Sequence, residues 1–277
     1  GKTPSNTIEP GRATIGVVGL GYVGLPLSVA FTDAGHDVIG FDTDAGLIES
    51  LDSGNSPVED VSDAQLEAAL DTGFEPTDQS SRLGSCDVFV FAVPTGVAED
   101  GSPDMSALSA AVETAAGERP DDEVTLFTVG STIYPGGVED VVRPAIERGG
   151  IPAHMSHVAV APERLSPGSE YGIGDIPVVV GADTGVALDM ATGVFRPVAA
   201  DVHQVGSTQI AAMAKLLENT YRLVNISLIN DLATTADRLD VDIWAAIEAA
   251  DTKPFGFQSF YPGVGIGGHC IPVDPEF

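Results

Sequence analysis

The chain has 277 residues, of which 43% are hydrophobic, and its 41 acidic residues against 12 basic ones give a formal net charge of −29. This hydrophobic fraction is typical of a globular protein and too high for a disordered acidic tail. So negative a charge repels nucleic-acid phosphates and anionic lipid headgroups, and no apolar stretch reaches the roughly 20 residues of a membrane-spanning helix. The composition therefore disfavours nucleic-acid and membrane partners. Residues 1–12 form a polar N-terminal tail without an apolar signal core, which favours a cytoplasmic location.

The acidic residues are dispersed along the chain, whereas lysine occurs at only three positions, Lys2, Lys215 and Lys253. A dispersed acid-rich surface stays hydrated, and concentrated salt screens its self-repulsion. We therefore hypothesise a halophilic protein, with an acidic enzyme from an ordinary environment as the alternative.

Strands and helices alternate in the predicted structure of residues 13–206. The first strand, residues 13–19, leads through a glycine-rich turn into a helix at 25–34 and a second strand at 37–41. Further strands are predicted at residues 88–92, 125–129, 157–160 and 177–181, with helices at 45–53, 63–71, 105–116 and 137–147. This alternation predicts an α/β domain with a Rossmann-like, doubly wound parallel sheet and helices on both faces.

The pattern changes after residue 206. Apolar residues three and four positions apart predict one long helix over residues 207–239, a short helix at 243–250 and a loop rich in proline and glycine from Lys253 onward. We expect residues 207–277 to form a central helical region, whose long helix connects domains or forms the core of a homodimer.

Gly19, Gly21 and Gly24 form a G-x-G-x-x-G motif between the first strand and the first helix. The first glycine of such a motif permits the tight turn, the second lets the backbone approach a pyrophosphate, and the third lets the helix pack close to the strand. Asp42, at the end of the next strand, is placed to bind a ribose 2′-hydroxyl and to repel a 2′-phosphate. These residues predict NAD as the cofactor, against the alternative of ordinary tight-turn glycines.

Two pairs of residues are candidates for a chemical role. Lys215 and Asn219 lie four residues apart and share one face of the long helix; Lys215 is either a surface lysine with its stem on apolar neighbours or a buried functional amine. Cys270 and Asp274 share a segment stiffened by a proline, and a thiolate near a carboxylate suits covalent catalysis followed by hydrolysis. Asp274 could instead cap a following helix. Cys86 precedes an apolar strand and is interpreted as a small packed residue.

No metal is predicted, because the five histidines do not cluster with the two cysteines at the spacing of a zinc site.

Six segments of the chain together resemble the nucleotide-sugar 6-dehydrogenases, the family of the UDP-glucose and UDP-N-acetylhexosamine dehydrogenases. The segments occur in the family's order and span nearly the whole chain, at residues 17–26, 93–95, 131–132, 161–164, 215–219 and 267–275. The His-Cys-Ile-Pro-Val-Asp-Pro form of the last segment and the Asp-Gly-Ser-Pro-Asp form of residues 100–104 are more similar to the N-acetylhexosamine branch, the UDP-N-acetylmannosamine and UDP-N-acetylglucosamine dehydrogenases.

The resemblance implies a UDP-sugar substrate, two molecules of NAD used in turn, and oxidation of the sugar C6 hydroxyl to an acid through a thioester on Cys270. It implies that Lys215 and Asn219 stabilise the oxyanion at C6. It further implies three residues that position and activate the hydrolytic water: Asp274, Thr132 and Glu163. The cofactor contacts it implies are Gly19, Gly21, Tyr22, Val23, Gly24, Asp42, Pro94, Thr95, Ser131 and Thr132. From the residues alone, Glu163 and Arg164 could be a salt-bridged loop pair, and Thr132 could cap a strand end.

The sequence departs from the family pattern in two places. Gly96 follows Val93-Pro94-Thr95 where the family usually has a second proline, and members normally continue past the position of Phe277 into a second α/β domain that holds the nucleotide part of the substrate. The resemblance therefore implies the N-terminal two-thirds of a UDP-N-acetylhexosamine 6-dehydrogenase. A UDP-glucose 6-dehydrogenase and a truncated, non-catalytic NAD-binding module are the alternatives.

Overall fold

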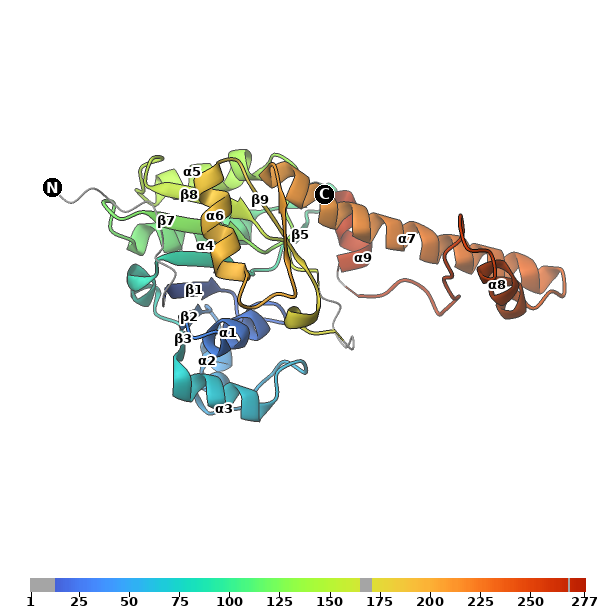
Figure 1. Cartoon of the computed structure of the whole chain (residues 1–277), viewed down its shortest axis with the longest axis horizontal. Coiled ribbons are helices and arrows are strands. Elements are labelled where there is room, and N and C mark those ends of the chain that lie inside the picture. Colours follow the sequence, from blue (N-terminus) through green and yellow to red (C-terminus); the bar gives the residue numbers. More distant parts are fainter. Residues whose placement is uncertain (1–12, 165–170, 269) are drawn as a thin grey trace. The chain divides into compact units, whose positions relative to one another are not determined.

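The computed structural model describes residues 13–164, 171–268 and 270–277, which belong to two compact units (Figure 1). Unit 1 contains the described residues up to Gly96 together with Pro103–Lys215, and unit 2 contains Val97–Ser102 and Leu216–Phe277. The predicted tail at residues 1–12 lies outside the described residues. Over the described ranges, every helix is either too short or too polar to cross a bilayer.

An eight-stranded sheet forms the centre of unit 1, in the order β10-β9-β8-β7-β4-β1-β2-β3. All neighbouring strands run parallel except β8 and β9, which are antiparallel. Two short strands pair separately, β5 (Gly96–Val97) and β6 (Pro103–Asp104). The strands of the large sheet are β1 (Thr14–Val18), β2 (Asp37–Phe41), β3 (Phe74–Thr77), β4 (Val88–Phe91), β7 (Thr125–Val129), β8 (Ser156–Val160), β9 (Val178–Ala182) and β10 (Val202–Val205).

Helices connect these strands and continue the chain beyond them. Those of unit 1 are α1 (Gly24–Asp33), α2 (Ala45–Asp52), α3 (Asp63–Thr72), α4 (Ser106–Glu118), α5 (Arg143–Arg148) and α6 (Gly185–Phe195). Short 3₁₀ turns lie at Ser80–Ser85, Ile173–Asp175 and Asp274–Glu276, and a π-helical turn lies at Val138–Val142. The remaining helices are α7 (Thr208–Arg238), in which the boundary between the units falls, and α8 (Ile243–Asp251) and α9 (Cys270–Val273) of unit 2.

The sheet is buried on both faces, as the continuous apolar run of β4 requires. Val88 and Val90 of β4 belong to the core that also contains side chains of α1 and α6. On the other face, Phe89 and Phe91 pack against Phe127 of β7, with ring centroids 5.5 and 6.3 Å away. Each fully buried phenylalanine contributes about 2–3 kcal/mol of hydrophobic stabilisation. This packing gives the loops at the strand ends a fixed support.

The predicted Rossmann-like α/β fold followed by a long helix is confirmed, but the sheet is mixed rather than wholly parallel. A parallel neighbour needs a crossover of a dozen or more residues, usually a helix. The described part of the connection between β8 and β9 contains only the 3₁₀ turn Ile173–Asp175, and β9 pairs in the opposite direction. The helix predicted at 137–147 is also different, because its first half is the π-helical turn and only Arg143–Arg148 is α-helical.

Among the strands of the large sheet and the α-helices of unit 1, three elements have no counterpart in the predicted set: β3, α6 and β10. β3 contains Pro76, which is tolerated because the strand lies at the edge of the sheet. β10 lies at the opposite edge and exposes His203 and Gln204, so it lacks the apolar run of a central strand. α6 contains Gly185 and Gly193, and glycine has a low helix propensity.

The long predicted helix is confirmed as α7, which starts one residue later and ends one residue earlier than expected. The apolar side chains that predicted it are exposed, each by 46–65%, and form what we call the α7 stripe: Ile210, Met213, Leu217, Tyr221, Val224, Leu228 and Leu232. The buried residues at the start of α7 lie on a different face, at Thr208, Ala211, Ala212 and Lys215.

Candidate active site

The sheet of unit 1 has a topological switch point between β1 and β4. From β1 the chain continues to β2 and β3 on one side, and from β4 it continues to β7 and β8 on the other. Open α/β sheets bind ligands at the carboxyl ends of the strands beside such a point. Gly19 follows β1, and residues 93–95 follow β4, so the predicted cofactor residues lie at this edge of the sheet.

The three glycines of the turn meet different surroundings. Gly19 has φ +92°, and a Cβ there would lie 2.7 Å from the Ala92 carbonyl oxygen, while a Cβ at Gly24 would collide with the Gly19 carbonyl oxygen. Around Gly21, by contrast, none of the described atoms lies within 4 Å of the Cβ position. Gly19 and Gly24 are thus required by the packing of the protein itself. Gly21 leaves open the space that a pyrophosphate needs to approach the backbone.

Helix α1 begins directly after this turn. Its N-cap residue is Val23, and no side chain among the described residues caps that end of the helix. The first N–H groups of α1 and its helix dipole can therefore stabilise a phosphate. Tyr22 is 66% exposed and Val23 is half-buried, so both predicted contacts are accessible. The open space at Gly21 and the uncapped helix fit a dinucleotide.

Asp42 lies at the end of β2 with its carboxylate fixed by backbone donors. The Leu20 N–H donates to Oδ2 at 2.9 Å, and the Asp44 N–H donates to Oδ1 at 3.0 Å. Each oxygen keeps a second lone pair that can accept from a ribose hydroxyl. Asp44 caps α2 by accepting from the N–H groups of Gly46 and Leu47. Two carboxylates at this corner favour NAD, because they repel the 2′-phosphate of NADP.

The remaining predicted cofactor residues lie after β4 and β7. The Ser131 hydroxyl donates to the Val93 carbonyl at 2.8 Å and so joins the ends of these two strands. Because that contact uses the only proton of the hydroxyl, Ser131 can only accept from a ligand. Thr95 and Thr132 are buried, whereas Pro94 is exposed.

Glu163 follows β8, the parallel neighbour of β7, and is therefore at the same sheet edge as Thr132. Its backbone N–H donates to the Gly130 carbonyl at 3.1 Å, and its side chain is half-buried. Arg164 donates from Nη1 to the Pro177 carbonyl at 2.9 Å. Unit 1 thus brings Thr132 and Glu163 to one edge of the sheet.

Unit 2 brings α7 and the C-terminal segment together. Asn219 Nδ2 donates to Asp274 Oδ2 at 2.6 Å, although the two residues are 55 positions apart. Asp274 is 2% exposed, and a carboxylate with so little exposure needs polar partners. The N-cap of the 3₁₀ turn there is Val273, and no side chain caps it among the described residues. The carboxylate of Asp274 therefore contacts α7, and the alternative of a helix-capping aspartate is wrong.

Lys215 is 8% exposed, so the alternative of a surface lysine is wrong. It lies on the same helix as Asn219, one turn earlier, and so on the same helix face. A buried amine of this kind is costly to keep without a role.

The two cysteines have opposite surroundings. Cys86 is fully buried before β4, and burial raises the pKa of its thiol to about 12, which confirms the interpretation as a packed residue. Cys270 is an exposed thiol at the first residue of α9. A cysteine reacts as a nucleophile only when its thiol is deprotonated and the reactant can reach it. His269, which precedes Cys270, lies outside the described residues.

Contacts between α7 and the glycine-rich loop were not predicted. The Tyr221 hydroxyl donates to Gln258 Oε1 at 2.7 Å, its ring packs edge-on against Phe260, and the Gly263 N–H donates to Asn230 Oδ1 at 2.9 Å. They hold the segment that leads to Cys270. The apolar spacing of α7 marks Tyr221 only as a hydrophobic position, so the sequence carries no signal for these partners more than 30 residues away. Within the described ranges, no three His, Cys, Asp or Glu residues are grouped so that they could hold a metal ion.

The switch point, the glycine turn and Asp42 define a dinucleotide-binding α/β protein. The NAD binding domain of the UDP-glucose/GDP-mannose dehydrogenase family matches residues 13–199, and the central domain of that family matches residues 209–277. The chain belongs to the UDP-glucose/GDP-mannose dehydrogenase family, and the predicted cofactor NAD is confirmed.

Named relatives support the same placement. The chain is 36% identical over 267 residues to a UDP-N-acetyl-D-glucosamine 6-dehydrogenase of Pseudomonas aeruginosa, a match that covers 95% of this chain and 62% of the relative. It is 37% identical to protein CapL of Staphylococcus aureus, covering 95% of this chain and 61% of that one. The structure of a UDP-D-ManNAc dehydrogenase from Pyrococcus horikoshii is similar with a TM-score of 0.87 and 33% identity, covering 95% of this chain and 63% of that one. The chain thus spans about three fifths of the length of these relatives.

Proposed function

We propose that the chain contains the NAD-binding and catalytic residues of a UDP-N-acetylhexosamine 6-dehydrogenase that oxidises UDP-N-acetylmannosamine or UDP-N-acetylglucosamine to the uronic acid. The observation that carries this proposal is the contact between Asn219 and the buried Asp274, four residues from Cys270. The names of the relatives above support the substrate class.

The turn at Gly19–Gly24, the N-terminus of α1 and Asp42 would hold NAD, which supplies the hydride acceptor for both oxidations. Lys215 stabilises negative charge on the C6 oxygen as the alcohol loses its proton. Asn219 has two N–H donors on Nδ2, and one of them donates to Asp274. The second remains for the same substrate oxygen.

Cys270 attacks C6 of the aldehyde through its thiolate, and a carbon–sulfur bond forms in a thiohemiacetal. Loss of a second hydride from C6 gives the thioester. Water then adds to the thioester carbonyl, the carbon–sulfur bond breaks, and Cys270 returns as a thiolate while the acid leaves. Asp274, Thr132 and Glu163 position and activate the water, and a carboxylate among them accepts its proton. Each sugar thus consumes one water and releases two hydrides and two protons.

The same proposal includes a cytoplasmic homodimer that serves polysaccharide biosynthesis. The support for a dimer is the α7 stripe, because a contiguous row of large exposed apolar side chains is characteristic of an interaction surface.

We also propose, from the composition, that the protein is adapted to high salt. This adaptation is supported by the net charge of −29 and by the few basic partners available to the acidic residues. Melting temperatures in 0.1 M and in molar KCl test it: the temperature should rise by at least several degrees with salt, since salt screens the repulsion. Equal melting temperatures would contradict it.

NADH formation by the natural protein at full length, with each of three UDP-sugars, tests the catalytic proposal. We expect kcat/KM for one of the two UDP-N-acetylhexosamines to exceed that for UDP-glucose at least about tenfold. Cys270→Ser should form no acid, whereas the control Cys86→Ala should keep the wild-type rate. Preference for UDP-glucose would instead identify a UDP-glucose 6-dehydrogenase. NAD binding without turnover of any sugar would identify a non-catalytic module. Full turnover by Cys270→Ser would exclude the thioester route.

A further inference from the structure

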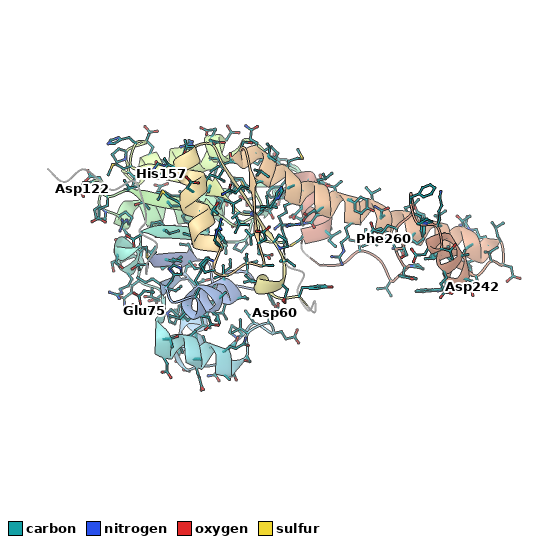
Figure 2. The ribbon with its side chains drawn as sticks, in the orientation of Figure 1. Asp60, Glu75, Asp122, His157, Asp242 and Phe260 are labelled. Carbon is teal, nitrogen blue, oxygen red and sulfur yellow. The ribbon has the colours of Figure 1, made fainter. Side chains whose placement is uncertain are left out.

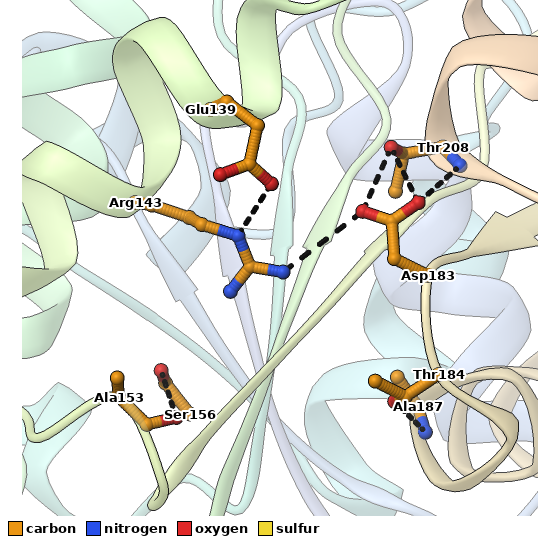
Figure 3. Close-up of polar contacts among 8 residues, drawn as sticks. All are labelled: Glu139, Arg143, Ala153, Ser156, Asp183, Thr184, Ala187 and Thr208. Atoms are coloured by element: carbon orange, nitrogen blue, oxygen red, sulfur yellow. Dashed lines mark hydrogen bonds and ion pairs between the residues drawn. The ribbon is translucent and has the colours of Figure 1, made fainter.

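The start of α7 is held by polar contacts among residues that have no role in the proposed reaction (Figure 3). The Thr208 N–H donates to Asp183 Oδ1 at 3.3 Å, and the Thr208 hydroxyl lies 3.2 Å from both oxygens of Asp183. Arg143 Nη2 lies 3.9 Å from Asp183 Oδ2, and Arg143 Nε donates to Glu139 Oε1 at 2.7 Å. These side chains link the segment after β7, the end of β9 and the first residue of α7.

Backbone packing at the same place leaves α7 little freedom. Gly181 lies against the first turn of α7, where a Cβ on Gly181 would collide with the Ser207 carbonyl oxygen and lie 2.7 Å from the Ala211 Cβ. The Ser207 hydroxyl accepts from the Ile210 N–H at 3.2 Å. Ser207 and Asp183 therefore each satisfy one of the backbone N–H groups that a helix start leaves without a helical partner. The negative charge of Asp183 also interacts favourably with the helix dipole.

The helix carries this fixed position to Lys215. Thr208, Ala211, Ala212 and Lys215 follow one another at the spacing of a single helix face, and their exposed fractions are 3%, 0%, 3% and 8%. Lys215 is seven residues from Thr208, about two turns or 10 Å along the axis. Because an α-helix is stiff over two turns, a shift of its first residue moves the amine by a comparable amount.

We propose that Asp183, oriented by Arg143, is a positioning residue for Lys215, fixing its amine through the hydrogen bonds to Thr208. The effect of Asp183 on catalysis rests on the role proposed for Lys215 in oxidation. Its effect on the position of the Lys215 amine does not, because that position can be measured without turnover.

The scarcity of lysine makes the measurement specific. Brief acetylation of the folded chain, followed by mass spectrometry of its peptides, gives the ratio of modification at Lys215 to that at Lys253, an exposed lysine that serves as the internal standard. Asp183→Ala should raise this ratio about fivefold, the factor expected for loss of a typical helix cap. Asp183→Asn keeps an oxygen that accepts from Thr208 and should stay within about twofold of the wild type.

A matched control is Ser62→Ala, which removes the cap of α3, where the Ser62 hydroxyl accepts from the Gln65 N–H. It should leave the ratio unchanged. A ratio for Asp183→Ala equal to that of the wild type, with melting showing a folded chain, overturns the inference. Should Asp183→Ala not fold, Thr208→Val removes the hydroxyl but keeps the backbone N–H. It should still raise the ratio about twofold, while Thr208→Ser should not.

Kinetics of the natural protein separate positioning from a general loss of structure. Asp183→Ala should lower kcat about tenfold at unchanged KM for NAD, and Asp183→Asn should restore most of it. A raised KM for NAD with unchanged kcat contradicts the inference. Failure of the proposed function is distinguishable, since it would appear as turnover by Cys270→Ser, whatever the acetylation ratio.

Discussion

The proposed cofactor residues of unit 1 and the proposed catalytic residues of unit 2 offer different kinds of groups to a ligand. In unit 1 the proposed cofactor residues rely on backbone: a glycine turn, the N-terminus of α1, which no side chain of the described residues caps, and Asp42, which is itself held by two backbone N–H groups. In unit 2 the proposed chemistry depends on side chains, Asn219, Cys270 and Asp274. Figure 2 draws the side chains of both units, with Glu75 and His157 labelled in unit 1 and Asp242 and Phe260 labelled in unit 2.

The difference explains how so acidic a chain can bind an anionic cofactor. Backbone N–H groups and a helix dipole bind phosphate without any lysine or arginine, so the surface can remain strongly negative. The few lysines are then available elsewhere, and one of the three, Lys215, is buried. The net charge and the binding of NAD are therefore independent properties of this chain.

The largest contrast between the units is expected in the reactivity of their thiols. With a pKa of about 12, Cys86 has a thiolate fraction of about 10⁻⁴ at pH 8, and it is also buried. Cys270 is exposed. Alkylation by iodoacetamide at pH 8 should therefore modify Cys270 more than about a thousandfold faster than Cys86.

Peptide mapping against time measures both rates in one sample. Because the raised pKa keeps Cys86 protonated, its rate should rise tenfold per pH unit up to the highest pH at which the chain stays folded. Comparable rates for the two thiols at pH 8 would show that the contrast is absent.

The glycines of the turn test the role of backbone packing. Gly24→Ala should lower the free energy of unfolding by about 3 kcal/mol and abolish NAD binding, because its Cβ meets the Gly19 carbonyl. Gly21→Ala should change the free energy of unfolding by less than about 0.5 kcal/mol, since its Cβ enters open space. It should nevertheless lower the affinity for NAD at least about tenfold. Urea unfolding and NAD titration of the two variants provide the measurements. Equal stability of both would mean that the turn does not need its third glycine.

Substitutions in the α7 stripe test whether this exposed apolar face of α7 has a partner. Leu217→Glu places a charge in the stripe and should weaken a homodimer at least about tenfold, because a buried unpaired charge is costly. Val186→Glu, on α6 of unit 1, introduces the same charge at another exposed apolar position and should have no effect. Analytical ultracentrifugation of wild type and both variants decides the matter. A wild-type chain that stays monomeric at high concentration would contradict the proposed dimer.

Local sequence signals predicted the parts of the structure that depend on few residues. Gly19, Gly24 and Asp42 could be placed because strand, turn and helix follow one another within about 30 residues. The reversal of β9 and the edge strands β3 and β10 could not, because strand direction and pairing depend on distant partners and not on the residues of the strand.

The same limit applies to the candidate site. The spacing of Lys215 and Asn219 showed that they share a helix face, but it left the burial of Lys215 open, since a stripe of apolar neighbours occurs on exposed and buried helices alike. The contact between Asn219 and Asp274 joins two elements 55 residues apart, and the hold of Asp183 on Thr208 joins two that are 25 apart. Such pairs arise only from tertiary packing.

We expect unit 1 to bind NAD independently of the proposed catalytic side chains of unit 2. Titration of the wild type, Asp42→Ala, Asn219→Ala and Asp274→Asn with NAD, and with NADP in parallel, measures this independence. We predict that Asn219→Ala and Asp274→Asn bind NAD within about twofold of the wild type. Asp42→Ala should lower the affinity for NAD at least about tenfold, and the affinity for NADP by less. Equal loss of affinity for both cofactors in Asp42→Ala, or a larger loss in the unit 2 variants, would show that NAD binding does not rest on Asp42 and unit 1 alone.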